Sequence, residues 1–590
     1  MEPSSRPSGR ARRARSTLAV TAGALVAALS GLGVQGAADA ADHGPAPASA
    51  GTASSAPSAA TGRYVVRLAA GEDAASTGLR AAVEAVGGRL LGEQHALHTA
   101  VVLLPPSMAG ALSGLPGVRA VVADQRMRTA SLGFSPSSQS GSMTNVTRLT
   151  GAQSLWKSGI TGAGVDVALV DSGVAPVRAL SDAAKVVVGP DLSFESQDPD
   201  LRYLDTYGHG THMGGIIAGR EIAKGSGTQY AADTTNFYGM APDARLVEVK
   251  VADHDGAVDV SQIIAAVDWV VQNKAANGLN IRVLNLSFGT MSPQSAQIDP
   301  LSWAAEVAWR NGIVVVASAG NEGATTPGIA NPAYNPFVLA VGAADTKGTD
   351  GTSDDTIPDF SARQGGNWGS RGIDVVAPGV GIVAPGVPGS GLITTYPGAV
   401  VGNGFLRGSG TSQAAAVVSG GVALLLQQRP RLTPDDVKQA LKATARVLPG
   451  QPATGQGSGE VNLSGASAFT PVNSAQTWQA GLGDGSLESA RNGFNLTMDG
   501  VPLNGELDIF GGQWHGSAMA SAAANRSAWS ADGFFNGTQW NAGSFAGDTV
   551  TVAGKTWSGK TWSGKTWSGK TWSGKTWSGK TWSGAVWSGA

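Results

Sequence analysis

The chain of 590 residues contains no cysteine. It therefore offers no disulfide bond, no thiolate nucleophile and no cysteine-ligated metal site. The HExxH pattern of zinc proteases is missing too, and outside residues 18–34 no apolar run is long enough to cross a bilayer uninterrupted. Glycine is abundant, with 84 residues, and hydrophobic residues make up 42% of the chain, enough for a sizeable core. This length predicts several segments rather than one domain.

Residues 1–40 have the pattern of an export signal. Five arginines precede the apolar run over residues 18–34, and Ala38-Asp39-Ala40 supplies a small-x-small cleavage pattern. An uncleaved membrane anchor is the alternative, which the cleavage pattern disfavours. The residues after Arg12-Arg13 fit a twin-arginine signal poorly, so the general secretory route is the default. We expect a secreted, extracellular and soluble protein, in which the Ala/Ser/Gly/Pro-rich residues 41–61 form a linker.

The charge is distributed unevenly along the chain. Residues 41–554 carry a net charge of −11, whereas residues 555–590 carry six lysines and no acid. An acidic body argues against nucleic acid as a partner. The basic tail leaves contact with anionic polymers open.

Residues 62–130 have the pattern of a small α+β unit. Strand candidates lie at 64–68, 89–91, 100–104 and 118–123, and helical stretches at 74–86 and 107–115. The β-α-β-β-α-β order is the ferredoxin-like arrangement.

Residues 147–468 alternate between apolar strands and helices. The strand candidates are residues 165–170, 246–251, 281–286, 313–317, 337–341 and 374–377. The helix candidates are residues 212–219, 260–274, 301–310 and 411–428, with a closing surface helix within 433–447. This alternation predicts an α/β fold with a doubly wound parallel sheet, whose active residues lie at the carboxyl ends of the strands.

Three short motifs place an Asp, a His and a Ser in that order. Asp171 ends an apolar run, His209 lies between two glycines, and Ser412 opens a helical stretch. A serine hydroxyl becomes a good nucleophile when a histidine accepts its proton and a carboxylate orients that histidine. The three residues are therefore candidates for a catalytic triad.

Each motif is ambiguous alone. Asp171 could be a turn residue and Ser412 a helix cap. His209 and His212 could form a metal pair, but no Glu accompanies them in an HExxH arrangement, so we expect no metal there. A fourth motif adds Asn321 after an apolar strand, where its amide can donate to an oxyanion beside the Ser412 N–H.

Taken together, the four motifs resemble those of the subtilisin family of serine proteases. They are Asp171-Ser172-Gly173, His209 to His212, Ala319-Gly320-Asn321 and Gly410-Thr411-Ser412. The resemblance implies a subtilisin-like fold and endopeptidase activity on proteins or peptides. It also implies that residues 62–130 are an inhibitor-like propeptide, removed autocatalytically between residues 128 and 140.

The same resemblance implies a substrate-binding set. Ser287, Phe288 and Gly289 would pair with extended substrate, while Ala319 and Gly320 would form the back of the pocket for the residue before the cut bond. Phe288 would narrow or line that pocket.

Two positions depart from the family pattern: Gln413 and Ala416 stand where the family usually has Met and Pro. These two departures leave substrate preference and local helix geometry open, but they do not put the catalytic chemistry in doubt. No cofactor is expected. Calcium stays open, with Asp198, Asp200 and Asp205 as available oxygen ligands but no clean acidic loop.

The C-terminal region changes composition twice. Residues 469–554 are a Gly/Ala/Ser-rich extension, and KTWSG repeats six times within residues 555–590. A small β-solenoid, an exposed tail that binds sugars or anionic wall polymers, and low-complexity disorder all fit this tail. Attachment to the cell wall is the functional hypothesis among them.

The sequence thus predicts a monomeric secreted serine endopeptidase made as a zymogen. A surface-binding protein with an inactive α/β scaffold is one alternative, which the intact triad disfavours. A protease that acts mainly in cis, maturing itself or one dedicated partner, is the other.

Overall fold

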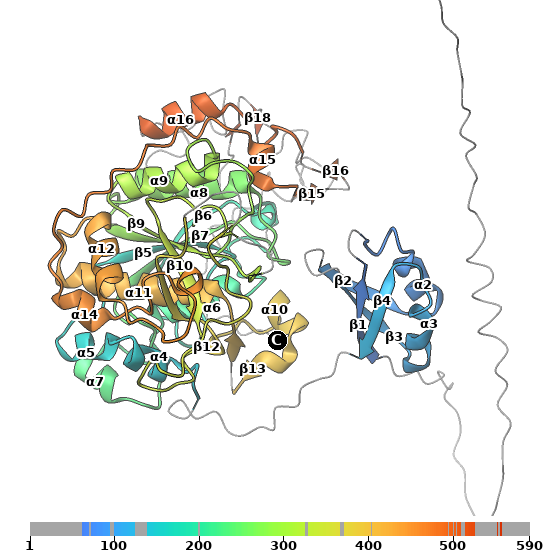
Figure 1. Ribbon diagram of the computed structural model, residues 1–590, viewed down its shortest axis with the longest axis horizontal. Coiled ribbons are helices and arrows are strands. Elements are labelled where there is room, and N and C mark those ends of the chain that lie inside the picture. The colour runs from blue at the N-terminus through green and yellow to red at the C-terminus, as the bar shows by residue number, and fades with distance from the viewer. Residues whose placement is uncertain are drawn as a thin grey trace, which may run out of the picture. The chain divides into compact units, whose positions relative to one another are not determined.

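The computed structural model describes residues 62–69, 72–94, 99–123, 139–198, 201–324, 328–365, 371–402, 404–493, 495–498, 501–502, 504–508, 514–525, 551–552 and 555–556. The chain forms two compact units, residues 1–128 and 129–590 (Figure 1). The expected signal, the linker and nearly all of the repeat tail lie outside the described residues. Among the described helices, none combines the length and apolar character that a bilayer-spanning helix needs.

The first unit is one four-stranded antiparallel sheet with helices. Its elements are β1 (Gly62–Leu68), α2 (Leu79–Ala85), β2 (Arg89–Gln94), β3 (Thr99–Leu104), η2 (Pro106–Met108), α3 (Ala109–Leu112) and β4 (Val118–Ala123). The sheet order is β2-β3-β1-β4. Val66, Leu79, Val83 and Val102 are buried in its core, which is separate from that of the second unit.

Both helices of this unit are shorter than the sequence predicts. The helix expected over residues 74–86 begins only at Leu79. Asp73 Oδ1 accepts hydrogen bonds from the N–H groups of Ala75 and Ser76, which closes a turn instead. Gly78 then adopts φ +67°, a left-handed conformation that a helix interior excludes.

The second unit is built on a seven-stranded sheet in the order β11-β10-β9-β8-β5-β7-β6. Its strands are β5 (Asp166–Asp171), β6 (Val186–Asp191), β7 (Arg245–Lys250), β8 (Ile281–Leu286), β9 (Val314–Ser318), β10 (Leu339–Ala344) and β11 (Val375–Pro378). All neighbours pair in parallel. The predicted parallel α/β sheet is therefore confirmed, and six of its strands match the sequence candidates within two or three residues.

Helices cover both faces of this sheet (Figure 1). On one side α6 (His209–Ala218) packs against α11 (Thr411–Gln428), and on the other α8 (Val260–Asn273) packs against α9 (Pro300–Arg310). Helix α8 starts at a capping box in which Asp259 and Gln262 satisfy each other's backbone N–H groups. The surface helix predicted within residues 433–447 is α12 (Pro434–Thr444), capped by Thr433.

Smaller elements complete the second unit. They are α4 (Met143–Leu149), α5 (Ala152–Lys157), η3 (Phe194–Gln197), α7 (Gly227–Ala232), β12 (Ile382–Pro385), α10 (Gly391–Thr395), η5 (Pro397–Ala399), β13 (Val400–Val401), β14 (Phe405–Gly408), α13 (Ala453–Gln456) and α14 (Leu463–Ala468). Strands β12, β14 and β13 form a separate antiparallel sheet.

The C-terminal extension continues the same unit. It contains α15 (Leu487–Arg491), β15 (Thr497–Met498), β16 (Val501–Pro502) and α16 (Gly516–Ala524), followed by the strand pair β17 (Thr551–Val552) and β18 (Lys555–Thr556). Helix α16 packs on α9, and Trp514, Met519 and Ala523 belong to the same hydrophobic core as the sheet (Figure 1). The described part of residues 469–525 is therefore packed onto the second unit.

Candidate active site

The carboxylate of Asp171 lies at the carboxyl end of β5, an interior strand of the sheet. Its Oδ1 atom is 2.7 Å from His209 Nδ1 and accepts a hydrogen bond from Ser172 N at 2.8 Å. Asp171 is 3% exposed, whereas the side chain of His209 is 22% exposed. The buried acid therefore contacts an imidazole that remains partly accessible. Two residues that lie 38 positions apart in sequence are brought into direct contact.

His209 is the first residue of α6, and glycines on both sides make its position possible. Gly208 has φ +97°, and a Cβ on Gly210 would collide with the carbonyl oxygen of Gly173. Helix α6 can approach the end of β5 closely only because this side chain is absent.

The charge environment favours a protonated His209. Burial lowers the pKa of His209, but the charge and hydrogen bond of Asp171, with a further contribution from Asp205, outweigh burial and raise it above its usual value. His212 behaves in the opposite way. Burial, and then the neighbouring His209, lower the pKa of His212 to about 3, so this residue stays neutral.

A buried network that the sequence interpretation missed holds the start of α6. Asp205 Oδ1 accepts from Ser172 Oγ and from Gly208 N, each at 2.7 Å, and its Oδ2 accepts from Thr211 N at 2.8 Å. Ser172 Oγ in turn accepts from Gly210 N at 2.8 Å. Asp205, which the sequence offered as a calcium ligand, uses both its oxygens to fix the helix that carries His209. An acid four residues before the histidine was the available signal.

Lys250 lies behind this network, at the end of β7. Its Nζ atom is 2.9 Å from Glu195 Oε2 and donates to the carbonyl oxygen of Ser172 at 2.9 Å. Burial lowers the pKa of Lys250, but Asp191, Glu195 and Asp205 outweigh burial and raise it. A buried positive charge therefore compensates the carboxylates beneath the site.

Ser412 is the second residue of the 18-residue helix α11 and is 8% exposed. Its hydroxyl donates to the carbonyl oxygen of Ser287 at 3.0 Å. The preceding Gly410 has no side chain, and its N–H donates to Gly379 O at 2.8 Å. The N–H groups at the start of α11 create a positive potential around Ser412.

Asn321 follows β9 and is exposed. Its Oδ1 atom accepts hydrogen bonds from Thr411 N at 2.9 Å and Thr411 Oγ1 at 3.1 Å. The side-chain oxygen is therefore bound to the residue before Ser412, and the amide NH₂ lies near Gly410, at the start of the same helix. Thr411 was named in its sequence motif, but no role was predicted for it.

The expected substrate-binding residues gather around Ser412. Ser287 lies just after β8 and is buried, Phe288 is half-buried against the core, and Gly289 is exposed. A Cβ on Gly289 would lie 2.5 Å from the carbonyl oxygen of Asn331. Ala319 is buried, and Gly320, with φ +108°, donates its N–H to Thr411 Oγ1 at 3.2 Å.

The structure also shows the surroundings of the residues that were considered as metal ligands. Among the described residues no group of three or more His, Cys, Asp or Glu side chains could hold a metal ion. Asp200 lies outside the described residues, and both oxygens of Asp205 accept hydrogen bonds from the chain itself.

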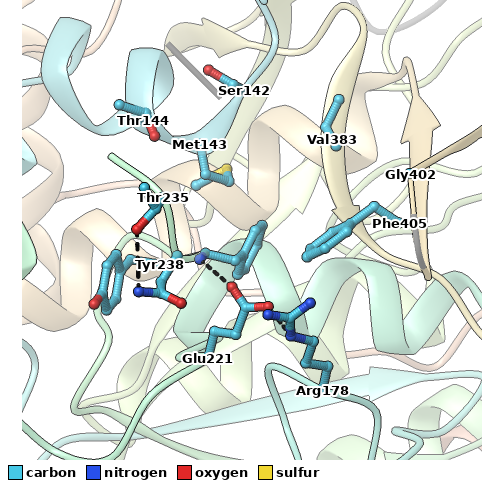
Figure 2. A pocket seen from close by; sticks show the side chains of 12 residues that line it. Ser142, Met143, Thr144, Arg178, Glu221, Thr235, Tyr238, Val383, Gly402 and Phe405 are labelled. Carbon is cyan, nitrogen blue, oxygen red and sulfur yellow. Dashed lines mark hydrogen bonds and ion pairs between the residues drawn. The ribbon is translucent and has the colours of Figure 1, made fainter. Parts of the chain in front are cut away.

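A cavity of about 320 Å³ lies at a different place, and Figure 2 shows the side chains that line it. Phe237, which lines it, packs against Gly219 where α6 ends, whereas His209 begins that helix. An ion pair between Arg178 and Glu221 closes one side of the cavity. Ten helical residues span about 15 Å, so this cavity is separate from the candidate triad.

Comparison with known proteins agrees with this geometry. The sequence model of the subtilase family matches residues 162–466. Serine protease AprX of Bacillus subtilis (strain 168) is 35% identical over 286 residues, which cover 48% of this chain and 61% of AprX. Subtilisin of Bacillus pumilus is 32% identical over 301 residues, which cover 50% of this chain and 89% of that protein. The matched region holds the seven-stranded sheet and all four motifs, and the chain belongs to the subtilase family of serine endopeptidases.

Proposed function

We propose that the chain is a secreted serine endopeptidase, made as a zymogen that processes itself, with Ser412 as nucleophile. The observation that carries the catalytic assignment is the 2.7 Å contact between Asp171 Oδ1 and His209 Nδ1. It fixes the tautomer in which Nε2 of His209 is free to accept a proton. Membership of the subtilase family supports the same chemistry.

In the proposed reaction the Ser412 hydroxyl leaves the Ser287 carbonyl and gives its proton to His209 Nε2. The oxygen then attacks the peptide carbonyl, and Asp171 stabilises the imidazolium that forms. The amide of Asn321 and the N–H of Ser412 hold the negative oxygen. His209 next protonates the leaving amine, and water releases the acyl group by the same steps. No cofactor takes part.

Protein or peptide substrate would bind as an extended strand along Ser287, Phe288 and Gly289. Backbone hydrogen bonds along this segment would supply affinity, and the pocket backed by Ala319 and Gly320 would select the residue before the cut bond. Gly289 supports this assignment because it is exposed and contacts the backbone of Asn331, so no side chain blocks the segment.

Residues 62–130 would act as propeptide and temporary inhibitor of the monomeric enzyme. They form a unit with a core of its own and precede the catalytic unit in the chain. The proposed secretion depends on the signal pattern of residues 1–40. Wall attachment depends on the lysines and tryptophans of residues 555–590. The proposal of wall attachment would be wrong if the isolated tail does not bind cell walls at low salt.

The test of the catalytic assignment compares the full chain with Ser412→Ala. The wild type should lose the residues before 139, label with a fluorophosphonate probe and digest casein. Ser412→Ala should do none of these. Ser154→Ala, the same change at an exposed position of α5, is the matched control and should behave as the wild type. Equal processing or labelling of wild type and Ser412→Ala would contradict the mechanism. A wild type that processes itself but leaves casein intact would restrict the activity to the chain itself.

A further inference from the structure

Helix α15 of the C-terminal extension contacts two loops at the catalytic edge of the sheet. The first loop, residues 252–259, follows β7 and leads into α8. The second, residues 287–294, follows β8. Strand β5 lies between β7 and β8, so the two loops start from strands that are not neighbours. Carboxyl-terminal loops of this kind form the ligand-binding edge of a parallel sheet.

The first loop lies beside the candidate catalytic histidine. A Cβ on Gly256 would lie 2.6 Å from the ring of Tyr207, so the loop backbone packs directly on that ring. Tyr207 stacks on His209 with ring centroids 6.4 Å apart. The loop ends at Asp259, whose carboxylate caps α8 by accepting from Ser261 N at 2.9 Å.

Arg491, the last residue of α15, reaches that cap. Its Nε atom donates to Asp259 Oδ2 at 2.6 Å, and both side chains are 0% exposed. The Nη1 atom donates to the carbonyl oxygen of Gly505 at 2.8 Å and to Glu488 Oε2 at 3.2 Å, and the Nη2 atom donates to the carbonyl oxygen of Leu507 at 2.6 Å and to Asp259 Oδ1 at 3.3 Å. The ion pair thus joins the extension to the end of the first loop across 232 residues of sequence. A buried arginine whose N–H groups are all hydrogen-bonded holds its partner in one geometry.

The other side of α15 holds the second loop. Thr290 Oγ1 donates to the carbonyl oxygen of Ala490 at 2.7 Å. Gln294 and Ser486 exchange two hydrogen bonds, each of 2.8 Å. Thr290 directly follows the segment that begins at Ser287, whose carbonyl oxygen accepts from the Ser412 hydroxyl.

We propose that α15 sets the spacing of these two loops for extended substrates, with Arg491 as a positioning residue. This inference depends on the proposed endopeptidase function. The extension is then part of the substrate-binding structure. Arg491 touches neither the triad nor the oxyanion site, so its loss should weaken the binding of long peptides and leave the chemical step intact.

The test measures KM and kcat for a peptide that spans both loops, beside the labelling rate with a small fluorophosphonate. In Arg491→Met we expect KM to rise about tenfold while kcat and the labelling rate change less than about twofold. Arg491→Lys, which keeps the charge, should recover part of the affinity. Arg245→Met is the matched control, because Arg245 makes a bidentate pair with Asp166 at the opposite edge of the sheet.

A KM equal to the wild type in folded Arg491→Met would overturn the proposal, and so would an equal rise in Arg245→Met. If Arg491→Met does not fold, Thr290→Val removes one of the hydrogen bonds between α15 and the second loop and should raise KM by itself. An unchanged KM in folded Thr290→Val would then overturn the proposal. A wild type that neither labels nor cleaves would instead refute the proposed function.

Discussion

A buried pair of carboxyl groups should make the catalytic unit less stable as the pH rises. Glu460 is 1% exposed and Asp355 is 3% exposed, and one buried oxygen of each, Glu460 Oε1 and Asp355 Oδ1, has no hydrogen-bond partner among the described residues. Burial raises the pKa of Glu460 to about 7 and that of Asp355 to about 6. Arg446, whose Nη2 lies 2.9 Å from Glu460 Oε2, offsets only part of this effect. Between about pH 4.5 and pH 7 the folded pair therefore retains a proton that the unfolded chain has already released.

The magnitude follows from the shift of Glu460. Its pKa is 4.5 in the unfolded chain and about 7 in the folded one, so folding takes up a proton between these values. Stability is fully present below about pH 4.5 and falls as the pH rises toward 7 and beyond. One pKa unit corresponds to about 1.4 kcal/mol, so the penalty grows from under ~1 kcal/mol at pH 5 to roughly 3 kcal/mol at pH 8.

Glu460→Gln tests this reasoning because glutamine is a permanently neutral replacement that still accepts from Arg446. We expect this variant to be about 2–3 kcal/mol more stable than its parent at pH 8, and within ~1 kcal/mol of it at pH 5. Urea unfolding followed by tryptophan fluorescence measures the difference, with Ser412→Ala in both chains to prevent self-digestion. Asp182→Asn, at an exposed carboxylate paired with Arg220, is the control. A difference that stays constant from pH 5 to pH 8 would refute the shared proton.

Three further predictions concern the catalytic site. Asp171→Asn should lower kcat on the order of 10³–10⁴-fold with little change in KM, because the amide stabilises the wrong tautomer of His209; a loss below tenfold in peptide hydrolysis would contradict that role. Asn321→Ala should lower kcat by about 10²–10³-fold, a figure known from subtilisin itself, and a change in KM alone would assign Asn321 to substrate binding instead. Because Asp171 outweighs burial and raises the pKa of His209 above its usual value, kcat/KM should rise with pH through a midpoint above 6.5. A lower midpoint, or a midpoint that does not fall in Asp171→Asn, would show that the carboxylate does not control this titration.

Much of the fold could be predicted because its signals are local. Buried parallel strands such as β8 and β9 are continuous apolar runs, and α11 and α12 begin at recognisable glycine or threonine positions. Strand β6 escaped prediction because Gly189 and Pro190 interrupt it and it lies at the sheet edge. The helix expected from residue 74 started later because the turn at Asp73 competed with it.

The candidate triad was predictable for the same reason. Each candidate catalytic residue lies in a motif of a few residues whose small neighbours are needed locally, as at Gly208 and Gly210 around His209. The residues that support the triad could not be predicted in this way. Asp205 looked like a metal ligand until its four hydrogen bonds placed it beneath α6.

The sequence by itself therefore determined the family, six of the seven strands of the central sheet and the candidate residues Asp171, His209, Ser412 and Asn321, since each depends on neighbours along the chain. Only the tertiary structure decided that Asp171 meets His209 and that the described part of residues 469–525 packs onto the second unit. The contact of Arg491 with Asp259 joins residues 232 positions apart. No local pattern encodes such a contact, because it exists only when the sheet, α8 and the extension have packed together.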